Sequence, residues 1–364
     1  MENFQIYRDI QARTGGDIYI GVVGPVRTGK STFIRRFMEI AALPQMSERK
    51  QAEIRDQLPL SGSGKIITTV EPKFIPKEAV SVSLGTEQKV RVRLIDCVGF
   101  LVKDAAGNME DGKERMVRTP WSEKAIPFHE AARIGTQKVI EEHSTIGLVI
   151  TSDGSCGELP RENLTEAEEK TIQELKKQHK PFLVLVNSQM PYKEAAQKAV
   201  SEIQEKYQVT ALSVNCDQLH KEDIAQILEK ILYEFPVSQI QFFIPKWVEM
   251  LPADHELKKQ LLEQIREKTK HLFQIRDITK EAIQLSGPYV KDSLLEDTGL
   301  SDGTVKVRVR IQDKYYYQML SQMSGTQMES EYELIHTIRD LVHMKEEYVK
   351  VQNALEEVRG SGYG

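Results

Sequence analysis

The stretch Gly-Pro-Val-Arg-Thr-Gly-Lys-Ser at residues 24–31 constrains the fold of this chain more than any other feature. It is a complete phosphate-binding loop, in which four residues separate a glycine from Gly-Lys-Ser. Gly24 and Gly29 allow the tight turn that points backbone N–H groups at a phosphate chain. Lys30 places a positive charge near the β- and γ-phosphates, and the Ser31 hydroxyl is a ligand for Mg²⁺.

The segments on both sides of the loop suit an anion site. Residues 17–23 read as a buried strand, and apolar residues at helical spacing predict a helix that runs to Pro44. A helix N-terminus directly after the loop favours bound anions. For Arg27 a surface salt bridge is the alternative role. The residues expected to contact a nucleotide here are Gly24, Pro25, Val26, Arg27, Thr28, Gly29, Lys30, Ser31 and Thr32.

The length and composition of the chain narrow the classes of protein to which it can belong. The chain has 364 residues, enough for two domains, and its formal net charge of -5 argues against a nucleic-acid partner. Its three cysteines are widely spaced and indicate neither a disulfide framework nor a zinc site, and Cys97 and Cys216 fall in apolar patterns that predict burial. No apolar run approaches the ~20 residues of a membrane-spanning helix. No transmembrane segment is therefore expected, and any membrane attachment should be peripheral.

Two strand-like segments follow the loop helix, at residues 79–84 and 88–95. A connection of three residues between them allows only an antiparallel hairpin. Asp96 ends the second segment, where its carboxylate can hold Mg²⁺, and the Gly99 amide can approach a γ-phosphate without a Cβ in the way. This topology is typical of the translation-factor GTPase class of P-loop NTPases.

A threonine in the loop before the hairpin would complete such a site, with its hydroxyl on the metal. Thr69 is the first choice and Thr68 the second. The alternative is that the threonine merely begins an extended segment. Ser31, Asp96 and Thr69 are thus the expected metal ligands, and Lys30, Asp96 and Thr69 the expected catalytic residues.

Strands and helices alternate in the rest of the first 238 residues. Apolar strands are expected at 145–151, 181–186 and 210–214, and the helices between them predict a mostly parallel sheet covered on both faces. The long charged segment at 100–127 is a candidate mobile element or assembly surface. We expect a P-loop NTPase domain over residues 1–238.

The residues after the expected strand at 181–186 indicate which nucleotide base the site recognises. GTPases of this class usually place Asn-Lys-x-Asp there, and the aspartate accepts two hydrogen bonds from guanine. Here the residues are Asn187-Ser188-Gln189-Met190, so the carboxylate is absent. Because rejection of adenine depends on that buried acceptor pair, guanine selectivity should be lost. The expected ligands are ATP and Mg²⁺, with Asn187 at the nucleotide.

Residues 239–364 read as a smaller α+β domain without catalytic groups. Strands are expected at 239–244 and 303–312, and long helices at 255–285 and 331–358. The apolar stripes of the helices are expected to pack on one another within the domain. A polymer interface is the alternative.

Several longer stretches resemble one family closely. They are Arg-Thr-Gly-Gly-Asp-Ile-Tyr at 13–19, Glu-Pro-Lys-Phe at 71–74, Leu-Ile-Asp-Cys-Val-Gly at 94–99, Thr-Pro-Trp at 119–121, Ile-Pro-Phe at 126–128 and His-Ser-Thr-Ile-Gly at 143–147. On these motifs the chain resembles the stage IV sporulation protein A family, the coat-assembly ATPases of endospore-forming bacteria. The resemblance covers essentially all of the chain and becomes looser after about Leu251.

The resemblance implies a cytoplasmic protein of the mother cell, located at the outer surface of the forespore. It implies an ATP hydrolase whose activity drives self-association into a static polymer, the basement layer of the spore coat. It also implies two partners, a small amphipathic membrane-bound peptide and another coat morphogenetic protein. Family members often place two threonines directly before Glu-Pro, whereas Val70 precedes Glu71 here. They also continue into a further C-terminal domain, which is expected to be absent from this chain.

Three functions therefore follow from the sequence. The first is an ATPase that hydrolyses ATP to assemble itself. The second is a scaffold that ATP stabilises without being hydrolysed, and the third is a GTPase that cycles reversibly.

Overall fold

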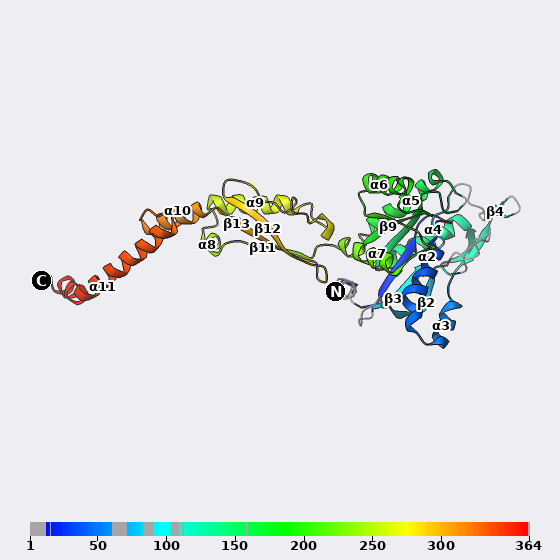
Figure 1. Ribbon diagram of the computed structural model, residues 1–364, viewed down its shortest axis with the longest axis horizontal. Coiled ribbons are helices and arrows are strands. Elements are labelled where there is room, and N and C mark those ends of the chain that lie inside the picture. Colours follow the sequence, from blue (N-terminus) through cyan, green and yellow to red (C-terminus); the bar gives the residue numbers. More distant parts are fainter. Residues whose placement is uncertain are drawn as a thin grey trace. The chain divides into compact units, whose positions relative to one another are not determined.

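The computed structural model describes residues 12–14, 16–59, 71–82, 90–102, 109–110, 113–157 and 159–362. The chain forms two compact units (Figure 1). The first unit contains residues 1–239 together with 273–277 and 298–304, and the second contains 240–272, 278–297 and 305–364.

A six-stranded sheet in the order β10-β9-β8-β1-β3-β2 forms the centre of the first unit. Parallel pairing joins five strands: β1 (Ile18–Val23), β3 (Val90–Asp96), β8 (Ile146–Ser152), β9 (Phe182–Asn187) and β10 (Ala211–Val214). The edge strand β2 (Lys73–Val82) runs antiparallel to β3, and Lys73 lies opposite Asp96. The expected mostly parallel sheet with one antiparallel pair is therefore present.

Helices cover both faces of this sheet because each carries an apolar side. On one face α2 (Lys30–Phe37), α3 (Glu48–Arg55) and α7 (Lys221–Tyr233) bury residues such as Phe33 and Leu228. On the other face α5 (Arg161–Lys177) and α6 (Glu194–Tyr207) bury Ile172 and Ile203. The two cores lie on opposite sides of β1, and the loop after β1 opens at the edge formed by the strands' carboxyl ends.

Short irregular helices extend two elements of the first unit. After α2 the chain continues through a π-helical turn, Met38–Ala42, and a 3₁₀ turn, Leu43–Gln45. The helix α4 (Phe128–Lys138) likewise continues into a π-helical turn, Val139–His143. The extension of α2 lies where the sequence predicted helix up to Pro44, so this helical segment has about the expected length.

The segment at 100–127 contains two small antiparallel ladders among its described residues. One joins β4 (Met109–Glu110) to β5 (Lys113–Glu114), and the other joins β6 (Met116–Thr119) to β7 (Ser122–Pro127). Phe128, which follows β7 at the start of α4, is fully buried and anchors the end of the segment. Its role as an assembly surface stays a prediction.

The second unit is a three-stranded sheet in the order β11-β13-β12 with helices around it. Its strands are β11 (Gln239–Phe243), β12 (Val290–Gly299) and β13 (Thr304–Ile311), and its first helices are α8 (Lys246–Met250) and α9 (Glu256–Thr269). The core contains Val248, Leu257, Leu261, Val309 and Ile311. The smaller α+β unit that the sequence predicted is present.

The expected long helix at 255–285 is wrong, because α9 ends at Thr269. The Thr269 hydroxyl donates to the Ile265 carbonyl at 2.8 Å, within the helix. Beyond it, the Asp277 carboxylate accepts from the backbone N–H of Gln274 at 2.8 Å, and the Ile275 N–H donates to the Phe235 carbonyl at 3.1 Å. These bonds satisfy the backbone outside a helix, so the apolar periodicity does not determine its end.

The last helices also differ from expectation. The sequence did not predict α10 (Asp313–Ser324), and α11 extends from Glu331 to Ser361. All of α11 is described, and none of its residues is buried. Its apolar stripe therefore does not pack within the second unit, which overturns that part of the expectation.

Candidate nucleotide-binding site

The loop between β1 and α2 has the backbone of a phosphate cradle. Gly24 has φ 130° and Gly29 has φ 99°, a region that residues with a Cβ rarely adopt. A Cβ on Gly24 would lie 2.4 Å from the Ile150 carbonyl oxygen, and one on Gly29 would lie 2.4 Å from Nδ2 of Asn187. Both glycines are therefore required by conformation and by space.

Two side chains, one in the loop and one at the end of β9, hold this loop in place. The buried Thr28 hydroxyl donates to the Ile150 carbonyl of β8 at 2.6 Å. Asn187, at the end of β9, donates from Nδ2 to the Thr28 carbonyl at 3.0 Å and accepts at Oδ1 from the Cys216 N–H at 3.0 Å. The Asn187 amide thus has partners at both ends and fixes the loop against β9 and the segment after β10.

Lys30 is buried, with 5% of its surface exposed. Its ammonium group donates to the carbonyl oxygens of Gly24, at 3.3 Å, and Pro25. Burial lowers the pKa of Lys30, while Cys97 and Asp96 act in the opposite direction. A positive charge held inside the loop is the group that a phosphate chain requires.

Asp96 lies beside the start of α2. The Ser31 hydroxyl donates to Oδ2 of Asp96 at 3.2 Å, whereas the buried Oδ1 has no hydrogen-bond partner among the described residues. Burial raises the pKa of the Asp96 carboxyl, and the charge of Lys30 lowers it. Because a buried carboxylate oxygen without a partner costs free energy, this atom indicates a missing ligand.

These oxygens fit Mg²⁺. The ion binds proteins through one or two carboxylates, together with hydroxyl, water and phosphate oxygens. Ser31 and Asp96 supply a hydroxyl and a carboxylate side by side, next to the loop. Within the described part of the chain no group of three or more His, Cys, Asp or Glu could hold a metal, so a cage made of protein ligands alone is not found there.

The turn after β3 contacts the loop directly. Gly99 has φ 91°, and a Cβ there would lie 2.0 Å from the Gly24 carbonyl oxygen and 2.8 Å from Nζ of Lys30. The Val26 N–H donates to the Phe100 carbonyl at 3.2 Å. The segment that the sequence assigned to γ-phosphate contact therefore lies against the phosphate loop.

Other expected site residues are placed as follows. Pro25 and Val26 are buried, Arg27 is half-buried with φ 62°, and Thr32 is half-buried on α2. Thr68, Thr69 and Val70 lie outside the described residues. The structure consequently brings together Lys30, Ser31, Asp96 and Gly99.

Sequence reasoning missed the partners that position the loop. The Ile150 carbonyl and the Cys216 N–H are backbone groups, which every residue type has, so no sequence signal could have shown them. The buried Ser188 could have been suspected from its place after Asn187. Its hydroxyl accepts from the Met190 N–H at 3.1 Å and helps to shape the turn at the expected base-binding edge.

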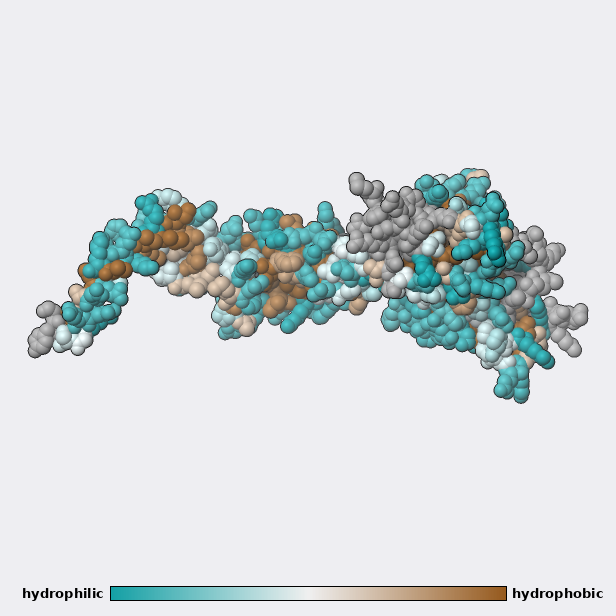
Figure 2. Space-filling model, turned by 90° about the horizontal axis from the view of Figure 1, so that it is seen from below, coloured by the Kyte–Doolittle hydropathy of each residue, from teal (hydrophilic) through white to brown (hydrophobic). Residues whose placement is uncertain are grey.

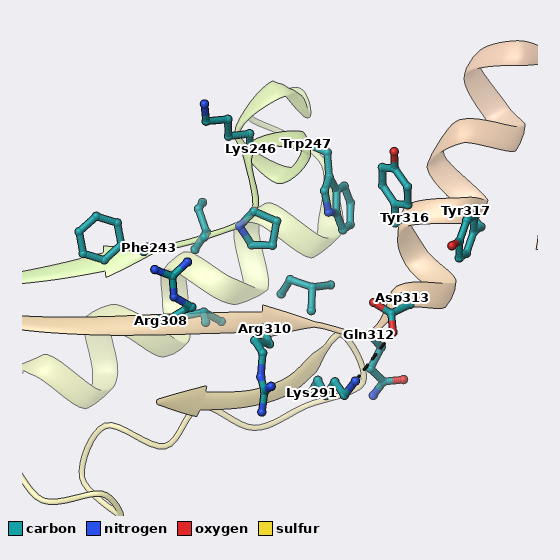
Figure 3. A pocket seen from close by; sticks show the side chains of 14 residues that line it. Phe243, Lys246, Trp247, Lys291, Arg308, Arg310, Gln312, Asp313, Tyr316 and Tyr317 are labelled. Carbon is teal, nitrogen blue, oxygen red and sulfur yellow. Dashed lines mark ion pairs between the residues drawn. The ribbon is translucent and has the colours of Figure 1, made fainter. Parts of the chain in front are cut away.

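A cavity with a volume of about 630 Å³ lies in the second unit. Figure 3 shows Trp247 of α8 and Tyr316 of α10 near one another at its wall, with Arg308 and Arg310 on β13. Both arginines are already paired, with Glu296 and Asp292 respectively. None of the residues that line it belongs to the phosphate loop, so the nucleotide site is not assigned there.

The fold and site of the first unit define a P-loop nucleotide-binding α/β domain. Residues 1–236 match the family model for the stage IV sporulation protein A ATPase domain, and residues 237–364 match the model for the middle domain of the same family. The chain belongs to the stage IV sporulation protein A family.

Three curated members of this family align with the whole chain. The chain is 42% identical to the stage IV sporulation protein A of Bacillus subtilis (strain 168) over 366 residues and 44% identical to that of Clostridioides difficile (strain 630) over 368 residues. It is 40% identical to the Bacillus anthracis protein over 368 residues. In each case the alignment covers 100% of this chain and 74% of the relative.

Proposed function

We propose that this chain is a sporulation ATPase that binds ATP with Mg²⁺ and hydrolyses it to drive its own assembly into the basement layer of the spore coat. One observation carries the ATP-hydrolysis part of the proposal. The phosphate loop, the buried Lys30 and the Ser31–Asp96 pair meet in one place, and one carboxylate oxygen there has no partner in the part of the chain that the structure describes. The match to the family's ATPase domain supports the same reaction.

Catalysis by these residues is mainly electrostatic. The loop N–H groups and Lys30 bind the phosphates and stabilise the charge that develops during phosphoryl transfer. Ser31 and Asp96 would hold Mg²⁺, with Thr69 as the proposed third ligand. When bound, the ion neutralises the charge on the β- and γ-phosphate oxygens. Gly99 leaves space beside Lys30 and places a backbone amide near the γ-phosphate.

One feature supports a fold of the translation-factor GTPase class, and a second supports ATP as the nucleotide. The antiparallel β2 beside β3 is the topology expected of that class. Met190 stands where guanine recognition needs a carboxylate, and it is 52% exposed. Asn187 already uses both ends of its amide on the protein, so its proposed effect on the nucleotide acts through the loop.

The cellular part of the proposal rests on the family. Its members are named for a stage of sporulation. We place the protein in the mother cell, peripheral to the outer membrane of the forespore. Its proposed partners are a small amphipathic membrane-bound peptide and another coat morphogenetic protein. Among the described residues no helix is long and apolar enough to cross a membrane.

Phosphate release from ATP and from GTP tests the proposal, with pelleting of the protein followed in parallel. Lys30→Ala and Asp96→Asn should each reduce ATP hydrolysis by roughly 100-fold or more, the typical loss for one transition-state contact. Lys50→Ala, on the exposed side of α3, is the matched control and should leave the rate unchanged.

The alternative functions give different results in the same assay. Tight ATP binding without phosphate release would indicate a scaffold that ATP stabilises. A strong preference for GTP would indicate a reversible GTPase. Hydrolysis that is unaffected by Lys30→Ala would contradict the assigned site.

A further inference from the structure

The loop after β9 carries two apolar side chains that are open to solvent, Met190 and Tyr192, here called the apolar pair. Met190 is 52% exposed and Tyr192 is 92% exposed. In the described part of the first unit, Met116 and Phe273 are the only other large hydrophobic residues that are exposed. On the face that Figure 2 shows, the described surface of this unit is mostly hydrophilic. Two such side chains on one short loop therefore set this loop apart.

The backbone of the loop is fixed by the surrounding structure. The Gln189 N–H donates to the Ser155 hydroxyl at 3.0 Å, and the Gln189 carbonyl accepts from Nδ2 of Asn215 at 3.2 Å. The Met190 carbonyl accepts from the Lys193 N–H at 3.0 Å. A rigid backbone thus presents the apolar pair, and a contact surface that is already ordered loses little entropy when a ligand binds.

The arrangement of the strands shows on which side of the phosphate loop a base must lie. The sheet order places β3 on one side of β1, and β8, β9 and β10 on the other. Asp96 and Gly99, the residues assigned to Mg²⁺ and to the γ-phosphate, follow β3. Because the γ-phosphate is the end of a nucleotide, the nucleoside must extend the other way, toward the carboxyl ends of β8 and β9.

The loops on that side contact the phosphate loop. Nδ2 of Asn187, three residues before Met190, donates to the Thr28 carbonyl at 3.0 Å. A Cβ on Gly29 would lie 3.9 Å from Cβ of Cys216, in the segment after β10. At the usual strand spacing β9 lies roughly 10 Å from β1, which is within the length of a nucleoside triphosphate. The apolar pair therefore lies within reach of the base.

Many polar groups along this edge already bond within the protein. The N–H groups of Asp217 and Gln218 donate to Oδ1 of Asn215 at 3.0 and 3.1 Å. The Cys216 N–H donates to Oδ1 of Asn187 at 3.0 Å. The backbone N–H groups of three consecutive residues after β10 are thus used, so apolar contact is the mode of base binding that this edge offers.

We propose that Met190 and Tyr192 form an apolar platform for the adenine ring of the bound nucleotide. The platform rests on the proposed function and specifies how that site holds the base. Stacking on a tyrosine ring stabilises a base without hydrogen bonds, and a methionine thioether packs favourably on aromatic rings. Guanine carries N1–H and 2-amino donors that find no carboxylate at Met190, so the platform favours adenine.

Calorimetric titration of the full chain with Mg²⁺-ATP and with Mg²⁺-tripolyphosphate tests the platform, because the second ligand has the phosphates without a base. Tyr192→Ala and Met190→Ala should each weaken ATP binding at least about 5-fold and leave tripolyphosphate binding within about 2-fold of the wild type. In phosphate-release assays the same variants should raise KM for ATP and leave kcat unchanged, since the base contact is the same in the ground state and the transition state.

Three variants serve as controls. Met116→Ala is matched to Met190→Ala, because Met116 is 54% exposed but lies on β6, and it should leave both ligands unaffected. Tyr192→Phe keeps the ring and should bind ATP as the wild type does. Gln189→Ala removes an exposed carboxamide from the same loop and should leave ATP binding unchanged.

Met190→Asp tests whether this position faces the base. The new carboxylate would accept hydrogen bonds from guanine, so the affinity for GTP relative to ATP should rise at least about 10-fold. An unchanged ratio would show that Met190 does not contact the base.

ATP binding that neither Tyr192→Ala nor Met190→Ala weakens would overturn the proposal. Equal weakening of ATP and tripolyphosphate would do the same, since it indicates a distorted phosphate loop. Lost pelleting with unchanged ATP binding would assign the apolar pair to a protein contact, and weakening by Gln189→Ala alone would assign the base to hydrogen bonding. ATP binding that depends on Tyr192 but leads to no hydrolysis would contradict only the proposed ATPase.

Discussion

At the scale of single residues, the site depends on where side chains are absent as much as on where they are present. Gly24, Gly29 and Gly99 leave the space in which loop carbonyls, the Lys30 ammonium and the Asn187 amide approach one another. Around them, Thr28 and Asn187 use their hydrogen bonds to fix the backbone. The phosphate loop is therefore held in shape before any ligand binds.

Gly99→Ala should disrupt this arrangement. The new Cβ would lie 2.0 Å from the Gly24 carbonyl oxygen, so the loop and the turn after β3 must separate. We expect a loss of roughly 3 kcal/mol or more in the free energy of unfolding and a loss of ATP binding. Urea unfolding and calorimetric titration with ATP measure the two effects.

Gly16→Ala is the control for backbone strain alone. Gly16 also has a positive φ, of 137°, but a Cβ there meets nothing within 4 Å. We expect it to cost about 1–2 kcal/mol and to leave ATP binding unchanged. Equal effects of the two variants would show that contact with Gly24 is unimportant.

At the scale of elements, a buried ion pair within α5 holds the arginine side chain that joins this helix to the sheet. Arg161 donates to the Glu168 carboxylate at 3.0 Å from Nη2 and also from Nη1, and its Nη1 donates to the Thr151 hydroxyl of β8 at 3.0 Å. Glu168 is 1% exposed and Arg161 is 16% exposed. This contact fixes the start of α5 beside the strand whose Ile150 carbonyl supports the phosphate loop.

Glu168→Gln should destabilise the protein by roughly 3 kcal/mol, since removal of one partner leaves a buried charge without compensation. The matched control is Glu166→Gln, two residues earlier on the same helix. Glu166 pairs with Lys170 at 2.7 Å on the surface, where such pairs contribute little. Urea unfolding should give a change within about 0.5 kcal/mol for this control. If both variants behaved alike, burial of the Arg161–Glu168 pair would have no special effect.

At the scale of the whole molecule, the chain returns to the first unit after leaving it. Residues 273–277 group with that unit, and Arg276 contacts the Glu234 carboxylate at 3.3 Å and the Gln208 carbonyl at 2.8 Å. Glu234 is 2% exposed, and burial raises its pKa while Arg276 lowers it. The returning segment thus supplies the positive charge that a buried carboxylate needs.

Arg276→Ala should destabilise the protein more at higher pH. A raised pKa means that folding favours protonated Glu234, so this carboxyl reduces stability as the pH rises through its pKa. Without Arg276 the pKa rises further, and the ionised form costs more. We expect a loss of roughly 2–3 kcal/mol at about pH 8 and a smaller loss at about pH 5. Urea unfolding at both pH values measures it, and a loss independent of pH would contradict the role of the charge.

The fold of the first unit was largely predictable from sequence. The phosphate loop, the alternation of strands and helices, the antiparallel pair at β2 and β3, and the burial of Cys97 and Cys216 all follow from patterns among neighbouring residues. The second unit was less predictable. The strand β12 has few buried residues and no regular alternation, and the end of α9 depends on bonds to distant backbone atoms.

The sequence by itself determined that this chain has a phosphate loop on an α/β sheet, because the loop's chemistry lies in eight consecutive residues. Only the tertiary structure decided how the loop is held, which oxygen of Asp96 lacks a partner among the described residues, and that α11 has no buried residue. The physical reason is that these features arise from contacts between residues far apart in the chain, often through backbone groups. Such contacts exist only once the chain is folded.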